Sequence, residues 1–295
     1  MINWYYAPTF LLFAVIIGLL AGSYPALVLS AYDPMEVLRG RFWSNKKGSF
    51  LRNALVVFQF GISATLIICT IVVYSQLSYI EGKSLGFNKD YVVSLQGAGF
   101  LDQQQSETFK NEIGKLPQVV SVAGCNAMPG GRFFGLSFKP EGANEMVTGR
   151  GLIIDDHYLE CMQMNLIQGR SYSEEFEDSL SVVINETALR DLGIEDPIGK
   201  HLTSNDDFLN PLEDVQSRYT IVGVVEDFHY QSLHQKIEPL FFVNHYLNQR
   251  QDNLISIRMK ADQVQESLLE VEQLWNQFLP DQPFSYTFLL SLIHI

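Results

Sequence analysis

Three residues that could bind a metal fall in one short segment, DFHYQSLH: Asp227, His229 and His234, with His245 close behind. Carboxylate and imidazole groups are the usual oxygen and nitrogen ligands of zinc. The two histidines of the segment are five residues apart. This spacing does not place them on one helical face, as the i, i+4 pair of zincins does. We therefore expect no metal site, and a membrane-anchored metal-dependent hydrolase is the weakest alternative considered.

A second candidate is the segment 193–200, GIEDPIGK, which has the general look of a phosphate-binding loop. Five residues separate its glycines where such a loop has four, and His201 follows Lys200 where Ser or Thr would bind magnesium. We expect a turn here, no nucleotide site and no cofactor. Residues 155–157 (DDH) are likewise expected to form a solvated turn that caps a helix.

The chain has three cysteines, Cys69, Cys125 and Cys161, which are too few for a disulfide framework. Cys125 and Cys161 can pair if both face an oxidising compartment, so a disulfide and two free thiols both stay open. The net charge is −13, and all but two of the 33 acidic residues follow residue 80. Such an acidic domain repels phosphates, so we expect no nucleic-acid partner.

Two uncharged apolar segments, residues 10–29 and 55–73, reach the length of about 20 residues that crosses a bilayer. Buried core helices are the alternative, but soluble cores rarely supply two such runs so close together. All the basic residues of the first 80 lie between residues 31 and 52. The positive-inside rule places this linker in the cytoplasm, so residues from about 75 onward are expected outside.

The outer part is expected to be an α+β domain. Its first elements (strand 91–95, helix 104–116, strand 119–123) resemble its last ones (strand 254–259, helix 263–278, strand 284–288). We therefore expect a β-α-β subdomain built from both ends, with a mixed subdomain of residues 126–250 inserted. Within the insertion we expect the elements strand 136–139, strand 148–154, helix 156–164, strand 181–184, helix 186–192, strand 219–225 and strand 240–243.

Several segments resemble the FtsX/MacB-like permease subunits of bacterial ABC transporters, above all the long duplicated permeases of Bacteroidetes-type bacteria. Two lie in the membrane part: AGSYPALVLSAYDPMEVLRG (21–40) and LRNALVVFQFGISATLIICTIVVYSQLSYI (51–80). The outer ones are INETALRDLG, DPIGK and IVGVVEDFHYQSLHQKIEPLFF. Their order and spacing across both spans and the outer domain carry the resemblance.

The resemblance implies a domain order. Residues 1–30 would hold the transmembrane helix that ends a first FtsX-type module, and 31–52 a cytoplasmic linker. Residues 53–82 would form a transmembrane helix with its stalk, and 83–289 a MacB-like periplasmic core domain. The chain would then be a fragment of a multi-pass protein of the bacterial inner membrane.

The resemblance also implies a function. A permease of this kind is not an enzyme; a separate cytoplasmic ABC ATPase hydrolyses ATP, and the permease converts that cycle into movement of its periplasmic domain, for export, lipoprotein release or mechanotransmission. The expected partners are this ATPase, the lipid bilayer, a second permease in a dimer or pseudo-dimer, and a periplasmic protein. An extracytoplasmic ligand-sensing receptor is the alternative, which would need a cytoplasmic signalling domain.

The residues expected to contact the ATPase lie in the cytoplasmic linker: Asp33, Pro34, Met35, Val37 and Leu38. The alternative is an interfacial helix whose basic neighbours contact anionic lipid. At the other end of the chain, residues 290–295 (LSLIHI) match one reading frame of a transposase adapter used in sequencing libraries. We expect these six residues to be adapter-derived.

Overall fold

The computed structural model describes residues 6–30, 46–82, 85–173, 175–206, 209, 217–231, 235–244, 252–261 and 263–292. The chain divides into two compact units, Met1–Gly82 and Lys83–Ile295. The first unit is helical, and the second, here called the outer unit, holds every strand that the structure describes. Because the outer unit has hydrophobic clusters of its own, we expect it to fold independently.

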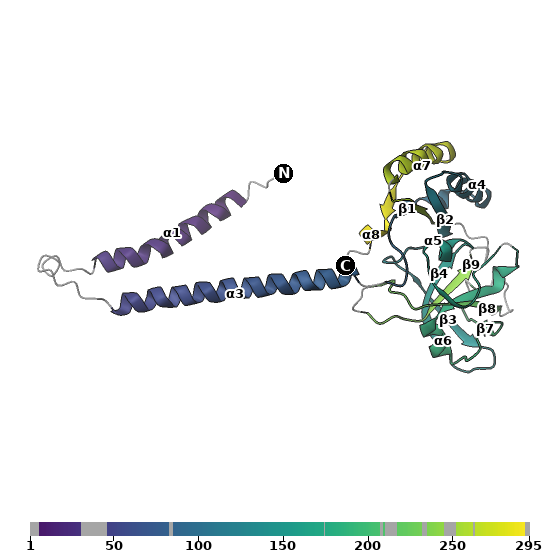
Figure 1. Ribbon diagram of the computed structural model, residues 1–295, viewed down its shortest axis with the longest axis horizontal. Coiled ribbons are helices and arrows are strands. Elements are labelled where there is room, and N and C mark those ends of the chain that lie inside the picture. The colour runs from purple at the N-terminus through teal and green to yellow at the C-terminus, as the bar shows by residue number, and fades with distance from the viewer. Residues whose placement is uncertain are drawn as a thin grey trace, which may run out of the picture. The chain divides into compact units, whose positions relative to one another are not determined.

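Helix α3 (Lys46–Gly82) is one uninterrupted helix of 37 residues (Figure 1). Its 27-residue stretch Arg52–Ser78 is long and apolar enough to cross a membrane, as expected for the second span. The hydroxyls of Thr65 and Thr70 donate to the carbonyls of Gly61 and Leu66 on the same helix. These polar groups are therefore satisfied without water, as a lipid environment requires.

Helix α1 (Tyr6–Ser30) has 25 residues. Its described apolar stretch, Leu12–Ser23, is shorter than a bilayer crossing needs. The first membrane span at residues 10–29 therefore stays a prediction.

The strands of the outer unit form one sheet in the order β11-β1-β10-β2-β4-β3-β7-β8-β6-β9, with β5 paired to β8 and β9 paired back to β4. The sheet has two parts. One takes its strands from both ends of the outer unit and is called the terminal subdomain. The other lies between them in sequence and is called the inserted subdomain. This α+β arrangement, with one subdomain inserted in the other, confirms the expected fold class.

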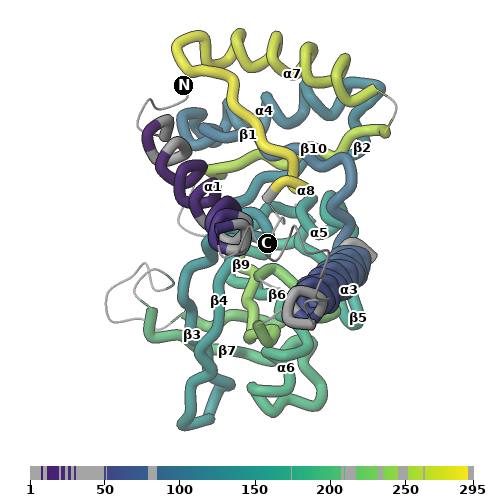
Figure 2. Tube along the Cα trace, turned by 90° about the vertical axis from the view of Figure 1, so that its left-hand side faces the viewer, coloured from purple at the N-terminus to yellow at the C-terminus, as the bar shows by residue number. Residues whose placement is uncertain are grey.

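The terminal subdomain contains β1 (Val92–Gln96), α4 (Gln103–Gly114), β2 (Val119–Cys125), β10 (Leu254–Met259), α7 (Val264–Phe278) and β11 (Tyr286–Phe288), with a 3-10 turn at Ala98–Phe100. Its four strands pair antiparallel. Helices α4 and α7 lie side by side across them (Figure 2). Phe109 of α4 and Trp275 of α7 pack edge to face in the shared core, with their ring centroids 5.8 Å apart.

The inserted subdomain contains β3 (Phe134–Pro140), β4 (Val147–Ile154), α5 (Tyr158–Cys161), β5 (Leu166–Gly169), β6 (Ser181–Asn185), α6 (Glu186–Leu192), β7 (His201–Thr203), β8 (Arg218–Val225) and β9 (Leu240–Asn244), with a 3-10 turn at Asp178–Leu180. Because β9 pairs back to β4, its strands close into a ring around an apolar core. The two subdomains share the sheet through one register pair, Cys125 with Ile154.

Three details of the inserted subdomain differ from the sequence expectation. The helix expected at 156–164 is only the single turn Tyr158–Cys161. Strand β5 (Leu166–Gly169), which follows it, was not expected, because all four of its residues are exposed and give no buried pattern. Strand β7 (His201–Thr203) was missed because three residues are too few to show a period.

Candidate functional site

Asn185 is the centre of the polar contacts at the start of α6. Its side chain is fully buried and uses every hydrogen-bonding direction of the amide. The Oδ1 atom accepts bonds from the backbone N–H groups of Ala188 (2.9 Å) and Leu240 (2.8 Å). The Nδ2 atom donates to the Asp227 carboxylate (2.8 Å) and to the Glu238 carbonyl (3.1 Å). Asn185 therefore joins β6, the N-terminus of α6 and the start of β9.

Asp227, which the sequence raised as a metal ligand, stabilises the N-terminus of α6 instead. Its Oδ1 accepts the backbone N–H of Thr187 at 2.9 Å. Its Oδ2 accepts the Thr187 hydroxyl at 2.7 Å and the Arg190 guanidinium at 3.2 Å. A carboxylate at a helix N-terminus is also favoured by the helix dipole. With the bond from Asn185, both carboxylate oxygens of Asp227 are engaged within the protein.

Of the remaining residues of the metal hypothesis, His229 is the one that lies in the described part of the chain. Within the described ranges, no group of three or more His, Cys, Asp or Glu side chains is placed to hold a metal ion. His229 uses its backbone N–H in the contact described next. His234 and His245 lie outside the described residues.

The segment after Asp227 contacts residues 85–91, here called the linker, which lies between α3 and β1 in the sequence. The His229 backbone N–H donates to the Leu85 carbonyl at 2.8 Å. Gly86 has φ +84°, and a Cβ there would lie 2.6 Å from the Cβ of Phe228, so only glycine fits. The Asp-Phe-His triplet thus connects the α6 N-terminus to the start of the linker.

Arg258 on β10 holds the second half of the linker. Its buried guanidinium donates to the carbonyls of Asn88 (2.7 Å), Asp90 (3.0 Å) and Cys161 (2.6 Å). The Asn88 backbone N–H in turn donates to the Met162 carbonyl at 3.0 Å. Burial lowers the pKa of the Arg258 guanidinium below its ordinary value. Its rigid fork of N–H donors ties the linker to both β10 and the end of α5.

Two residues beside the contacts of Arg258 have a left-handed backbone conformation although neither is glycine. Tyr91 ends the linker with φ 56°, and Gln163 follows α5 with φ 52°. Such conformations are uncommon for residues with a side chain and cost on the order of 1–3 kcal/mol each. The Asn88 side chain donates to Gln163 Oε1 at 2.8 Å. The contacts around Arg258 therefore hold two backbone segments away from their preferred conformations.

Strand β11 leads the chain out of the sheet beside β1. The two strands are antiparallel, and Val93 pairs with Phe288. The segment after β11 therefore leaves the sheet at the end where the linker arrives. Leu289, the next residue, is fully buried. The start of β1 and the end of β11 thus lie at the same end of two neighbouring strands.

Comparison with known families agrees with this organisation. The sequence profile of the MacB-like periplasmic core domain matches residues 58–273, more than half of the chain. The chain belongs to the MacB-like periplasmic core domain family. This match confirms the resemblance to FtsX/MacB-like permeases that the motifs carried.

Three solved structures are similar to the MacB-like chain. The periplasmic region of MacB from Actinobacillus actinomycetemcomitans is 17% identical with a TM-score of 0.49, and the alignment covers 72% of this chain and 95% of that one. The extracellular domain of the noncanonic ABC-type transporter YknZ from Gram-positive bacteria is 13% identical, with a TM-score of 0.45 and coverages of 66% and 98%. A domain from Porphyromonas gingivalis, titled as a permease protein, is 18% identical, with a TM-score of 0.44 and coverages of 68% and 92%. No match is found among curated protein sequences.

The family-like segments of the MacB-like domain have structural roles. The turn expected at 193–200 is present: the Gly199 N–H donates to the Ile221 carbonyl, and the Ile221 N–H donates back to Lys200. Gly193 ends α6 in the left-handed region. The expected ATPase contacts, Asp33, Pro34, Met35, Val37 and Leu38, lie outside the described residues.

The two cysteines of the MacB-like domain, Cys125 and Cys161, are free thiols. Both are buried in one apolar cluster. Burial raises the pKa of the Cys161 thiol to about 12, and it raises that of Cys125 further. Both groups are therefore protonated and unreactive at neutral pH.

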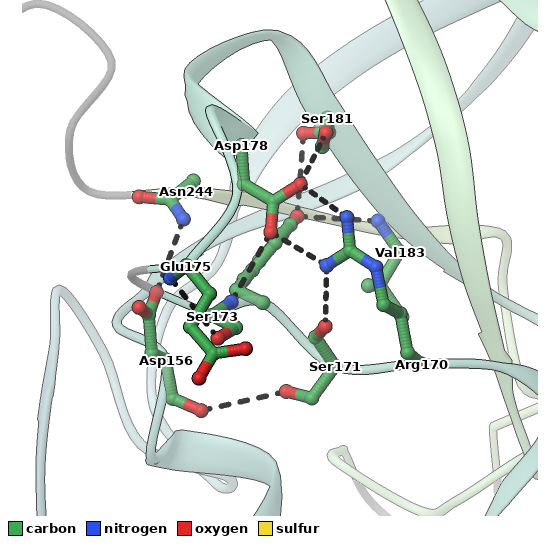
Figure 3. A network of polar contacts seen from close by, with 10 residues as sticks. Asp156, Arg170, Ser171, Ser173, Glu175, Asp178, Ser181, Val183 and Asn244 are labelled. Carbon is green, nitrogen blue, oxygen red and sulfur yellow. Dashed lines mark hydrogen bonds and ion pairs between the residues drawn. The ribbon is translucent and has the colours of Figure 1, made fainter.

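A polar network holds the segment between β5 and β6 against the sheet of the MacB-like domain (Figure 3). Arg170 forms two hydrogen bonds with the Asp178 carboxylate, 2.6 and 2.8 Å long. The Ser181 hydroxyl and the Ser173 N–H also donate to that carboxylate. The Tyr172 hydroxyl continues the network into the sheet by donating to the Phe242 carbonyl at 2.7 Å.

Asp178→Asn is expected to destabilise the MacB-like domain by about 2 kcal/mol at pH 7, the range of a hydrogen bond to a charged group. Burial would raise the pKa of Asp178, but bonds from Arg170 and Ser181 hold it below its ordinary value. The lowered pKa means that the carboxylate stabilises the fold above about pH 4 and that this contribution fades as the pH falls through the folded pKa. Urea unfolding at pH 7 and pH 3 should show the two proteins converging in acid; an equal gap at both values would contradict this.

Asp155 does not lie in a solvated turn, as the sequence had suggested. Nor does its side chain cap α5: its Oδ1 accepts the His157 N–H at 3.1 Å in the turn before the helix, and the N-cap residue is His157, without a side-chain cap bond. The carboxyl group is buried, and its Oδ2 accepts the Gly124 N–H at 2.5 Å and the Lys110 ammonium at 2.8 Å. The sequence pattern around residue 155 gave no sign of a cation that would be supplied by α4.

Proposed function

We propose that this chain is part of the membrane permease subunit of an ABC transporter. In this proposal a separate cytoplasmic ATPase hydrolyses ATP, and the permease couples that cycle to movement of the periplasmic domain in export, lipoprotein release or mechanotransmission. The observation that carries the proposal is the attachment of the linker. The residues that follow the candidate membrane helix are held by Arg258 and by the Phe228–His229 segment, so a displacement of the linker is passed to the sheet.

The proposed location is the bacterial inner membrane, with several spans and with residues from about 75 onward in the periplasm. The proposed contact with the ATPase is the cytoplasmic linker, at Asp33–Leu38. A permease dimer or pseudo-dimer and a periplasmic partner protein complete the assembly. The proposal does not specify a transported substrate.

Movement of the periplasmic domain is tested in the full permease, reconstituted in lipid nanodiscs with the ATPase that copurifies from membranes. Spin labels on α7 of the two copies in the proposed permease dimer report the distance between their periplasmic domains. Addition of ATP and vanadate is expected to change this distance. Arg258→Met should keep ATP hydrolysis but reduce the change by more than half, because methionine cannot bind the linker carbonyls.

Arg218→Met is the matched control for this experiment. Arg218 is an exposed arginine on β8 that pairs with Glu141, away from the linker. It should behave as the unmodified protein does. Absence of any copurifying ATPase, or an unchanged distance during hydrolysis, would contradict the proposed function.

The membrane topology gives a separate prediction. A cysteine at Gln265, which is exposed on α7, is expected to react with an impermeant thiol reagent in cells whose outer membrane is permeabilised. A cysteine at Ser44, in the basic cytoplasmic linker of residues 31–52, is expected to react only after lysis. Native Cys125 and Cys161 are buried and should stay silent. The reverse labelling pattern would invert the topology.

A further inference from the structure

Lys110 is a charged residue on the buried face of α4. The residues of this helix that face the core are Ser106, Phe109, Lys110 and Ile113, which follow the spacing of a helical stripe. The ammonium group of Lys110 lies 2.8 Å from Asp155 Oδ2, 3.2 Å from Asp252 Oδ2 and 3.0 Å from Glu107 Oε1. Both aspartates are as deeply buried as the lysine, whereas Glu107 is partly exposed.

The three buried charges come from both subdomains. Lys110 belongs to the terminal subdomain. Asp155 directly follows β4 of the inserted subdomain, and Asp252 lies where the chain has left β9 and approaches β10. Gly124 on β2 completes the site: its N–H binds Asp155, and a side chain on it would overlap the Asp252 carboxylate. This cluster, here called the Lys110 cluster, therefore lies where the chain passes between the subdomains.

Among the described residues, the bond from Arg258 to the Cys161 carbonyl also joins the subdomains, and few other polar bonds do so at this crossing. The sheet continues from one to the other through the single pair Cys125 and Ile154, flanked by backbone bonds from Asp155 N–H to Gly124 and from Asn126 N–H to Ile153. Apolar packing of α5 against β2 buries surface between the subdomains, but because the hydrophobic effect is non-directional it does not fix their relative orientation. A buried ion cluster does fix the orientation, because its charges are paired in only one arrangement of the two subdomains that carry them.

The Lys110 ammonium stays charged in this position. Burial alone would lower its pKa, but Asp155, Asp252 and Glu107 raise the pKa above its ordinary value. One cation thus lies between two buried carboxylates and weakens their mutual repulsion. Rotation of one subdomain against the other would separate these charges in a low-dielectric site, where the cost is large.

We propose that Lys110 is a positioning residue that fixes the orientation of the inserted subdomain against the terminal subdomain. Its role in transport rests on the proposed function: a domain that passes on the displacement of the linker must move as one body. The linker contacts both subdomains, the terminal one through Arg258 and the inserted one through Met162 and His229. The Lys110 cluster keeps the two subdomains in one orientation while the linker moves.

The test measures the distance between the subdomains in the full chain in nanodiscs without ATP, so its outcome does not depend on the proposed function. Spin labels are placed at two exposed positions, Gln265 on α7 and Glu195 after α6, with Cys69 replaced by serine. The unmodified protein is expected to give one narrow distance distribution. Lys110→Met combined with Asp155→Asn and Asp252→Asn removes all three charges at nearly unchanged side-chain size. This triple variant should fold and broaden the distribution at least twofold.

Lys115→Met is the control. Lys115 directly follows α4, is exposed, and pairs with Glu112 three residues earlier. This variant should leave the distribution narrow, as should the conservative Lys110→Arg. The test does not rely on Lys110→Met alone, because the triple variant carries the same change without the two buried carboxylates. A triple variant with the unmodified width and a near-native melting temperature would overturn the proposal. A broad distribution in the unmodified protein would overturn it without any variant.

Discussion

Replacing Asn185 with alanine is expected to lower the free energy of unfolding of the outer unit by about 4 kcal/mol, among the larger effects of a single substitution. The change removes four hydrogen bonds at a fully buried position. The backbone N–H groups of Ala188 and Leu240 lose their acceptor, and a buried donor without a partner costs about 1–3 kcal/mol. Water cannot easily replace the amide, because Asn185 is completely enclosed.

Urea unfolding followed by the fluorescence of Trp275 measures this loss, because Trp275 is the one tryptophan of the outer unit. Asn165→Ala is the matched control. Asn165 is exposed, and its side chain donates to Glu226 at 3.0 Å. Its replacement is expected to change stability by no more than about 0.5 kcal/mol. Similar small losses in both variants would contradict the central role of Asn185.

Lys110→Met alone is expected to destabilise the outer unit by about 3–5 kcal/mol, the cost of leaving buried charges without a counter-ion. Methionine fits the apolar stripe of α4, so lost packing cannot account for the effect. What remains is two buried carboxylates, those of Asp155 and Asp252, that have lost the ammonium group they share. One of them must then take up a proton or admit water.

The prediction for Lys110 is checked by the same unfolding measurement. Adding Asp155→Asn and Asp252→Asn to Lys110→Met should recover most of the loss, because no unpaired charge remains. Lys115→Met should change stability by less than about 1 kcal/mol, as is usual for an exposed ion pair. If the triple variant were as unstable as Lys110→Met, packing rather than charge would explain the loss.

The long apolar and amphipathic elements could be predicted from the sequence because the spacing of their hydrophobic residues is typical of a strand or of a helix. The run YTIVGVV gave β8, and the buried stripe that ends in Trp275 gave α7. The similar patterns at the two ends of the outer domain also predicted that they share one subdomain. The ring closure of the inserted subdomain could not be predicted, since the pairing of β9 with β4 joins strands far apart in sequence.

The site was predicted less well than the fold. Asp227 and His229 were noticed as chemistry-bearing residues, but a sequence does not show that a carboxylate is occupied by the donors of a distant helix. Lys110 and Arg258 were missed, although each left a signal. Lys110 occupies a core position in an amphipathic helix, and Arg258 interrupts a strand whose neighbours are buried. A charged residue at a position that the hydrophobic periodicity places in the core indicates a buried ion pair or a side chain bound to several backbone carbonyls.

The place of β1 in the sheet has a consequence for biosynthesis. Both neighbours of β1, β10 and β11, are made last, because they lie after residue 253. When β1 is synthesised, its edges have no partner until nearly the whole outer unit has been made. Contacts over such a separation form slowly, and an unpaired apolar strand is prone to aggregate. Pairing of β1 should therefore be one of the last steps in the folding of this domain.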